Sequence, residues 1–200
     1  MSKIQEFLKN QEKSVMSIVE GKTIIDYLNN NAEESSDYPA LNTPINNEYT
    51  GWDSISWSEY QETVHSLASG LIDIGIQAED NAFIVANNVK EHFISDLGIM
   101  HAGAVPSTIY KQLKSGQIEY ISNLLEAKVA FVGDAELFTE VNKAKNNCPD
   151  LKYIIMMYFM SGQLSFALLT SVNSSASPTK ATFASSRLEM YSICPDLSCL

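Results

Sequence analysis

The sequence predicts an α/β fold in which a mostly parallel sheet is flanked by helices. Two kinds of segment predict it. Short apolar runs without alternation, Ala82–Ala86 and Val129–Val132, are typical of parallel strands that are covered on both faces. Around them lie segments of roughly 10 to 15 residues with apolar side chains at helical spacing. Strands that alternate with such helices imply right-handed βαβ units.

The first expected helix begins at Thr23, and residues 1–22 are expected to form a leader. The leader is rich in charge and only weakly periodic, which is typical of a terminus that is loosely attached to its domain. Thr23 is a favourable N-cap residue for a helix that reaches about Ala32, because its hydroxyl can accept a hydrogen bond from the first turn. Pro39–Asn42 is then expected to form a short strand.

A second helix is expected to start after Ser56 and to pack on the sheet. Ser56 and Glu59 form a capping-box pattern, in which each side chain accepts from the backbone amide of the other residue. Gly75 supplies the left-handed residue that ends the helix. The apolar stripe, at spacings of three and four, consists of Tyr60, Val64, Leu67, Ala68 and Leu71.

The remaining elements continue the alternation of strand and helix. After the strand Ala82–Ala86, we expect in order a helix Glu91–Ala102 ended by Gly103, a strand Ala104–Tyr110, a helix capped by Ser115, a strand Val129–Val132, a helix from the cap Asp134 to about Lys145, and a strand Tyr153–Met157. The side chains expected to face inward from the first and second of these helices are Phe93, Ile94, Leu97 and Met100, and then Ile118, Ile121, Leu124 and Leu125.

The composition changes after Met157. Charged residues become sparse, serine becomes abundant, and we expect no capped helix or turn-bounded strand. The predicted organisation is therefore a leader of residues 1–22, an α/β portion of residues 23–157 and an atypical tail of residues 158–200. Out-of-frame translation, a mis-spliced end, a divergent insertion and a disordered segment are all compatible with such a tail.

The charge balance disfavours one class of partner. The formal net charge is -11 and the pI is about 4.6. A surface of that sign repels phosphate backbones and anionic headgroups, so we expect no nucleic-acid partner.

The rest of the sequence favours an intracellular, cytoplasmic setting. Three cysteines show no CxxC pattern and no paired framework, and the polar N-terminus lacks the apolar core of an export signal. The longest apolar stretch, Ile154–Leu169, is interrupted by polar residues and falls short of the roughly 20 residues that a spanning helix needs, so we expect no transmembrane span. Peripheral association with a membrane stays open.

One segment superficially resembles a phosphate-binding loop. Ser174–Lys180, with the sequence SSASPTK, supplies hydroxyl groups and one lysine but no glycine. Without glycine the backbone cannot easily approach a phosphate group closely, so we read the segment as a coincidence within serine-rich sequence.

The remaining candidate side chains do not form a recognisable centre. His92 and His101 are nine residues apart, which places them on opposite faces of one helix. Glu62 and His65 form a single ExxH pattern, whereas two-metal bundles need two, so a solvated pair is expected. Cys148 precedes Pro149 in an expected loop, and no neighbour in the sequence lowers its pKa, so it is expected to be an ordinary thiol.

The segment Asn87–Asp134, read as helix, strand, helix and strand, resembles the AMP-forming acyl-CoA synthetases. The similarity runs from about Thr23 to about Met157 and is closest to the long-chain fatty-acid CoA ligases. The segments that carry it most clearly are HAGAVPSTIY at His101–Tyr110, the helix Trp57–Gly75 and the Pro-Ala-Leu strand at Pro39–Leu41.

The resemblance implies an N-terminal fragment of the large AMP-binding domain. In that family the intact enzyme uses ATP, Mg²⁺ and CoA to convert a fatty acid into acyl-adenylate and then acyl-CoA. The ATP-binding loop and the adenylation residues of the family lie further downstream, so we expect this portion to be inactive alone. No catalytic, cofactor-binding or metal-binding residue is transferred from the family to this chain.

Two other classes of protein remain open from the residues themselves. One is a non-catalytic interaction or remnant protein whose exposed sheet edge contacts a partner. The other is a self-contained, flavodoxin-like module that binds a small molecule, because the alternation of strands and helices alone permits such a fold.

Overall fold

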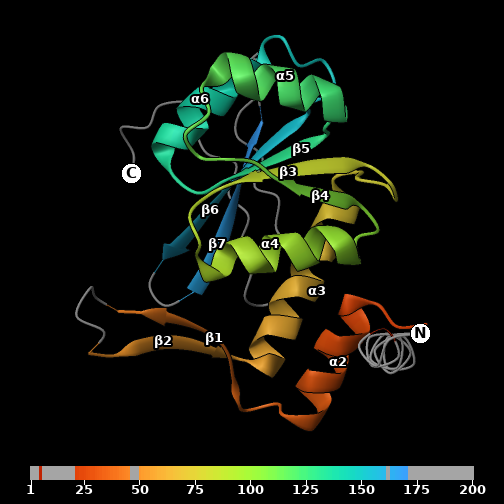
Figure 1. Cartoon of the computed structure of the whole chain (residues 1–200), viewed down its shortest axis with the longest axis vertical. Helices are drawn as coiled ribbons and strands as arrows, with labels where there is room; N and C mark the ends of the chain where they lie inside the picture. The colour runs from red at the N-terminus through yellow and green to blue at the C-terminus, as the bar shows by residue number, and fades with distance from the viewer. Residues whose placement is uncertain (1–4, 6–20, 46–49, 161–162, 171–200) are drawn as a thin grey trace.

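The computed structural model describes residue 5 and residues 21–45, 50–160 and 163–170 (Figure 1). The elements are, in chain order, α2 (Ile24–Glu34), β1 (Pro39–Pro44), β2 (Trp52–Ser56), α3 (Trp57–Asp73), β3 (Asn81–Val85), α4 (Lys90–His101), β4 (Val105–Thr108), α5 (Ser115–Leu125), β5 (Val129–Val132), α6 (Ala135–Lys145), β6 (Tyr153–Met160) and β7 (Gln163–Thr170). The predicted alternation of helices and strands is confirmed.

The main sheet is mostly parallel, as predicted. Its strand order is β4-β3-β5-β6-β7, with β4, β3, β5 and β6 parallel and β7 antiparallel to β6. The first strand of the main sheet in chain order is β3. The chain then forms β4 on one side of β3 and crosses over to form β5 and β6 on the other side. A separate antiparallel hairpin, β1–β2, precedes α3. This is the doubly wound arrangement, in which the direction of winding reverses between β3 and β5.

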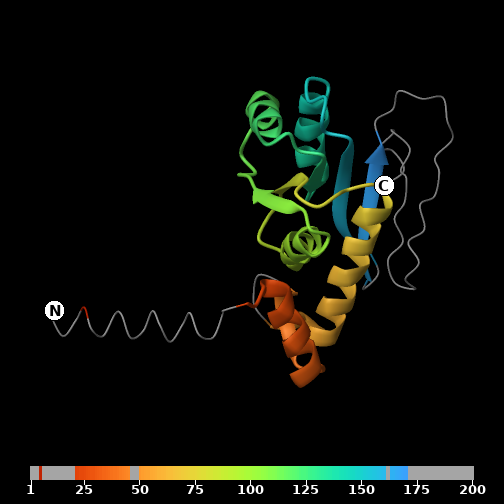
Figure 2. The ribbon, with the colours of Figure 1, turned by 90° about the vertical axis from the view of Figure 1, so that its right-hand side faces the viewer.

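Two helical layers cover the two faces of the main sheet. α3 and α4 pack on one face, with α2 packed against these two helices, and the strand residues of that face are Ala82, Ile84, Val129, Phe131 and Ile155. α5 and α6 pack on the opposite face, whose strand residues are Phe83, Val85, Ala130, Val132 and Ile154. Figure 2 shows α3 on one side of the sheet and the α5–α6 pair on the other. Because β3 and β5 are covered on both faces, all four residues from Ala82 to Val85 and all four of β5 are buried.

The helix starts and stops follow the local signals in the sequence. Thr23 and Ser56 each form the complete capping box, with Asp26 and Glu59 respectively. The side chain of Asp134 accepts from the amide of Leu137 at 2.8 Å. Gly75 and Gly103 adopt positive φ angles of 89° and 82° after α3 and α4. These predictions are confirmed because each depends only on neighbours within one turn.

The predicted cap of α5 is wrong by one residue. Lys114 is the N-cap and Ser115 is the first residue of the helix. The amide of Ser115 donates to Oε2 of Glu140 on α6 at 2.9 Å, so a neighbouring helix supplies the acceptor that a serine cap would otherwise provide. The Lys114 amide in turn donates to Oε1 of Gln117 at 3.2 Å.

Two strands of the structure, β2 and β7, were not predicted from the sequence. β2, Trp52–Ser56, directly adjoins α3 and pairs with β1. The expectation of no strand after Met157 is also wrong, because β6 continues to Met160 and β7 pairs with it from Tyr153↔Thr170 to Met160↔Gln163. The printed sequence holds a signal for β7, since apolar residues alternate through it after a Ser-Gly pair.

Some helix residues expected in the core are exposed. Phe93, Leu124 and Met100 are 53%, 69% and 36% exposed, respectively. Ile94 is buried as expected, and the other buried positions of α4 are Lys90, Glu91, Ser95, Gly98 and Ile99. Gly98 lets α4 approach Leu67 of α3 closely, and the hydroxyl of Ser95 donates to the sulfur of Met157 in β6, so the contact stripe is rotated toward these small residues.

The apolar stretch Ile154–Leu169 forms most of the β6–β7 pair. Within the residues that the structure describes, none of the helices has the length and apolar character needed to cross a bilayer.

Proline occupies an edge strand, as its missing N–H requires. Pro106 lies in β4, the first strand in the sheet order. The amides of Val105 and Ile109 donate inward to Asp80 and Ile84 of the neighbouring chain segment. Because amides alternate along a strand, the nitrogen of Pro106 faces away from the sheet. The prediction that this proline tolerates a strand position is confirmed.

Candidate functional site

The described part of the molecule contains a pocket of about 310 Å³ between α2, α3 and α4. It lies at the N-terminal end of α3, beside the layer that covers one face of the sheet. Its lining residues are Ile24, Tyr27, Leu28 and Asn31 from α2, Trp57 and Tyr60 from α3, and Phe93, Asp96 and Leu97 from α4. Four of the nine are aromatic and one is a carboxylate, so the pocket combines aromatic walls with one acidic group.

Each helix contributes side chains at helical spacing. Residues three and four apart share one face of a helix, and the lining positions of all three helices follow that rule. Leu28 and Tyr60 are buried and anchor the pocket to the core, whereas Ile24 and Phe93 are each 53% exposed and form its rim. The ring centroids of Trp57 and Tyr60 lie 6.2 Å apart, within the range of aromatic pairs.

The polar groups of the pocket are few. The hydroxyl of Tyr60 donates to the backbone carbonyl of Phe93 at 3.3 Å, which ties α3 to α4. Burial, followed by the nearby charge of Asp96, raises the pKa of Tyr60 well above its usual range. Partial burial also raises the pKa of Asp96, against a smaller opposite effect of His92. Asp96 therefore lies in surroundings that solvate its charge poorly.

The carboxyl ends of β3 and β4 carry a second polar cluster. His92 Nε2 lies 3.0 Å from Oγ1 of Thr108, its Nδ1 lies 3.4 Å from the carbonyl of Asn87, and the Asn87 side chain accepts from Lys111. Ligands of doubly wound sheets bind near this end, where the winding reverses. Here, a Cβ on Gly133 would lie 2.9 Å from that of Ala86, so the turns after β3 and β5 touch closely at the reversal point.

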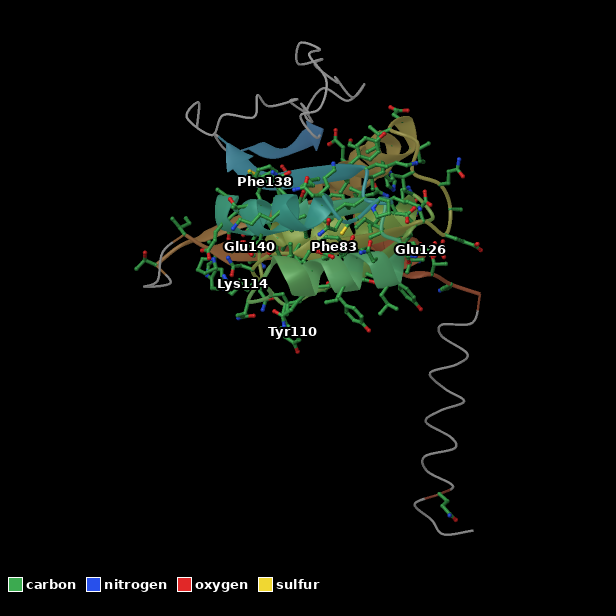
Figure 3. All side chains as sticks on the ribbon, turned by 90° about the horizontal axis from the view of Figure 1, so that it is seen from above. Phe83, Tyr110, Lys114, Glu126, Phe138 and Glu140 are labelled. Atoms are coloured by element: carbon green, nitrogen blue, oxygen red, sulfur yellow. The ribbon has the colours of Figure 1, made fainter. Side chains whose placement is uncertain are left out.

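A third polar cluster joins the start of α5 to α6. Figure 3 labels Lys114 and Glu140, which lie near each other from these two elements. Glu140 accepts from Lys143 at 2.9 Å and from the Ser115 amide, and these two hydrogen bonds hold its pKa below its usual range. Lys114 lies 3.8 Å from Glu136. These groups, of which Glu140 is partly buried, satisfy one another, which is typical of helix ends.

The histidines are arranged differently from the sequence expectation. His65 of α3 and His101 of α4 stack, with ring centroids 4.4 Å apart and planes 12° apart. The Nε2 of His65 is buried and has no hydrogen-bond partner among the described residues. His92 is remote from this stack, at the carboxyl end of the sheet. Among the described residues, no group of three or more His, Cys, Asp or Glu side chains is placed to hold a metal ion.

Cys148 lies in a loop after α6, as expected, and is buried against the α5–α6 layer. It is 3% exposed, and its Sγ lies 3.9 Å from the carbonyl oxygen of Glu119. Burial raises the pKa of the Cys148 thiol, which keeps it protonated and unreactive. The other two cysteines and the segment Ser174–Lys180 lie outside the described residues.

No residue of the aromatic pocket was identified as a site residue from the sequence. Its walls come from three helices, and the lining residues run from Ile24 to Leu97, so no local motif marks it. The available signal is weak: Phe93, Asp96 and Leu97 place a carboxylate on an apolar helical face, and the exposure of Phe93 leaves that face uncovered.

Comparison with known proteins gives one family. The model of the AMP-binding enzyme family matches residues 28–185. The chain is 28% identical over 151 residues to the long-chain-fatty-acid–CoA ligase heimdall of Drosophila melanogaster, which is 74% of this chain and 22% of that protein. It is 27% identical over 107 residues to an uncharacterized protein of Mycobacterium tuberculosis, which is 54% of this chain and 58% of that protein.

The fold agrees with a solved structure. The anthranilate CoA ligase AuaEII, solved with anthranoyl-AMP, superposes with a TM-score of 0.60 at 22% identity, over 66% of this chain and 24% of that one. The chain thus spans less than a quarter of the ligase and of the solved structure that it matches.

Proposed function

The chain belongs to the AMP-binding enzyme family, and from this premise we propose that it is the N-terminal part of the adenylating domain of a long-chain fatty-acid CoA ligase. The observation that carries the proposal is the family match over residues 28–185, combined with a matched length of only 22% of the fatty-acid CoA ligase heimdall. The fatty-acid substrate rests on the name of that relative and on the resemblance in His101–Tyr110 and Trp57–Gly75.

The intact enzyme would join a fatty acid to CoA in two steps. The carboxylate oxygen attacks the α-phosphorus of ATP, forming acyl-adenylate and releasing pyrophosphate, with Mg²⁺ balancing phosphate charge. The CoA thiol then attacks the acyl carbon, and AMP leaves. The present portion would supply a wall of the domain rather than reacting groups. We assign no catalytic or cofactor-binding residue within it.

The buried strands support this structural role. β3 and β5 are covered on both faces, so they pack tightly between the two helical layers and expose no apolar surface. Such a rigid sheet would hold the downstream nucleotide-binding segments in register. We also propose that the intact ligase resides in the cytoplasm. It would contact a membrane peripherally, because its fatty-acid substrate partitions there.

Sequencing of the transcript across the codons for residues 158–200, read in all three frames, tests whether the tail is native. An alternative frame that continues into a glycine-rich loop ending in lysine would show that the printed tail is not native, although the family model matches the printed frame as far as residue 185. If the printed frame is the native one and no longer product exists, the proposal of a ligase fails.

An activity assay tests the expected inactivity of this portion. The purified chain of 200 residues, given ATP, Mg²⁺, CoA and a fatty acid, is expected to form no acyl-CoA. Acyl-CoA formation that requires ATP and is abolished by heating the protein would contradict it. The heated sample is the control for non-enzymatic thioester formation.

A second candidate is a self-contained binding module. The order β4-β3-β5-β6, with helices on both faces, is the flavodoxin-like order of doubly wound folds, and a relative of Mycobacterium tuberculosis is matched over 58% of its length. Thermal unfolding with and without a flavin or an adenine nucleotide discriminates it. A rise in Tm that increases with ligand concentration would favour the module.

A third candidate, an interaction or remnant protein, predicts association through a sheet edge. The outward-facing Pro106 disfavours pairing at β4, because a new strand would lack one donor there. Sedimentation at several protein concentrations tests this candidate, and a single monomeric species would count against it.

A further inference from the structure

The pocket between α2, α3 and α4 has the composition of a cation-binding cage. Aromatic faces carry negative electrostatic potential and attract ammonium groups that lie within about 6 Å of the ring centroid. Tyr27, Trp57, Tyr60 and Phe93 line the pocket from three helices. Its volume of about 310 Å³ is at the lower end of the range for small-molecule sites.

Asp96 supplies a formal charge to the same cavity. Its carboxylate makes no hydrogen bond or ion pair with any residue that the structure describes, although it is only partly exposed. Burial raises its pKa, against a smaller opposite effect of His92. A positive group placed in the pocket would compensate for this loss of solvation.

The ammonium group of Lys22 lies over the ring of Tyr27, one of the residues that line the pocket. Nζ of Lys22, just before α2, lies 5.6 Å from the ring centroid of Tyr27. This contact is an observation independent of the cavity and of Asp96. It shows that Tyr27 stands where an ammonium ion is attracted to its ring. The net charge of -11 would further raise the concentration of cations near the surface.

From these three observations we infer that the pocket binds a small organic cation, an alkylammonium or quaternary ammonium group with an apolar body. The ammonium group lies between the aromatic rings and Asp96, and the apolar body contacts Leu28 and Leu97. A quaternary group suits the site well, because it donates no hydrogen bonds and the pocket offers few acceptors. This site does not depend on the ligase proposal.

Trp57 provides a direct optical probe of binding. The chain has two tryptophans, Trp52 and Trp57, and Trp52 lies in β2 outside the pocket. In a Trp52→Phe background, all tryptophan emission comes from Trp57. The full chain is titrated with choline chloride at constant ionic strength and, separately, with dimethylbutanol, the uncharged carbon isostere of choline.

We expect choline to change the Trp57 emission saturably and to bind between about threefold and about thirtyfold more tightly than the isostere. Asp96→Asn keeps the shape of the side chain, and we expect it to weaken choline binding by about threefold to tenfold while leaving the isostere unaffected. Tyr27→Leu should weaken choline binding alone by a similar factor.

Asp73→Asn is the matched control. It removes the same charge from the exposed C-terminal end of α3, whereas the pocket lies at the N-terminal end of that helix. We expect no change in choline affinity for Asp73→Asn. Far-ultraviolet circular dichroism of each variant establishes that it is folded before titration.

Three results would overturn the inference. Equal affinity for choline and its isostere would make the pocket merely apolar. If Asp96→Asn and Asp73→Asn weakened choline binding equally, the attraction would come from the net charge of the protein and not from the pocket. The absence of a saturable change in Trp57 emission with choline, in a protein whose circular dichroism is unchanged, would exclude the site. Transferred nuclear Overhauser contacts between the N-methyl protons and aromatic protons provide a second measurement.

Discussion

The α5–α6 layer and the α2–α3–α4 layer cover the same sheet in different ways. The first buries mainly apolar side chains against the strands, together with the Ser122 hydroxyl, and its charged groups Glu140 and Lys143 pair locally. The second also contains a buried ion pair, a histidine stack, a close glycine contact and the aromatic pocket. The difference suggests that one layer stabilises the fold while the other holds features that cost stability and have a further use.

Truncation of a buried strand residue should cost the same stability on either face of the sheet. Phe131 faces the α2–α3–α4 layer and Phe83 faces the α5–α6 layer, and both are completely buried. We expect Phe131→Ala and Phe83→Ala each to lower the free energy of unfolding by about 3–5 kcal/mol, through lost burial and a cavity. Urea denaturation measures both, with Tyr110→Ala as the control.

Tyr110 is 80% exposed, and Figure 3 shows it at the periphery while Phe83 lies inside. Its replacement should change the free energy of unfolding by about 0.5 kcal/mol or less. If one of the two buried phenylalanines proved as neutral as Tyr110, the sheet would not be the shared core of both layers.

The ion pair tests whether the second layer holds a costly buried charge. Lys90 at the start of α4 pairs with Asp53 of β2, and their side chains are 5% and 42% exposed. Asp53→Asn leaves a buried ammonium with one partner fewer, whereas Lys90→Met leaves a carboxylate that water reaches. We expect a loss of about 2 kcal/mol for Asp53→Asn and about 1 kcal/mol for Lys90→Met, measured by urea denaturation. The reverse order would show that packing of the lysine stem dominates.

Two helical glycines sharpen the comparison of the layers. A Cβ on Gly98 would lie 2.6 Å from Cδ2 and 2.9 Å from Cγ of Leu67, whereas a Cβ on Gly116 of α5 would meet nothing within 4 Å. We expect Gly98→Ala to destabilise the fold by about 1 kcal/mol, because overpacking outweighs the gain in helix propensity. Gly116→Ala should stabilise it by about 0.5 kcal/mol.

Thermal unfolding of both glycine variants distinguishes the two effects. A gain in stability for both would mean that α3 and α4 separate easily enough to admit a methyl group. The layer would then be softer than its close contact indicates.

The histidine stack gives the smallest expected effect, a dependence of stability on pH. Burial, and then the charge of His101, lower the pKa of His65 below its usual value. The charged form is therefore favoured in the unfolded chain. This contribution to stability is complete above a pH of about 6.5, the pKa in the unfolded state, and is lost as the pH falls through the lower folded value.

His65→Phe keeps a ring against His101 and removes the titrating group. We expect the variant to lose less stability than the parent chain between about pH 7.5 and about pH 5, measured as the change in Tm. His92→Phe, remote from the stack, is the control and should retain the dependence of the parent chain. Identical pH profiles for His65→Phe and the parent chain would show that His65 is not the group responsible.

The elements that could be predicted from the sequence are those that short-range physics determines. Ser56 and Glu59 satisfy helix amides within one turn, and the runs in β3 and β5 have no polar face to expose. β2 could not be recognised in the same way, because its ladder needs β1, and its last residue also caps α3.

The candidate site depends on contacts that the sequence does not display. Tyr60, Phe93 and Tyr27 converge only after α2, α3 and α4 have packed. The orientation of α4 was misjudged in part, because the small residues Ser95 and Gly98 are buried beside Ile94 and Ile99 while Phe93 is exposed. The stack of His65 on His101 is a tertiary contact of the same kind, and no spacing rule within a single helix predicts it.

Pro106 also bears on how the chain behaves while it is being synthesised. A ribosome releases the N-terminal elements of a polypeptide first, so β4 is exposed to neighbouring nascent chains before later segments exist. An edge strand that presents its amides in that interval is a template for intermolecular pairing. Because the outward position at Pro106 has no N–H to donate, the nascent sheet lacks one donor along its β4 edge, and this proline is expected to reduce aggregation of the growing chain.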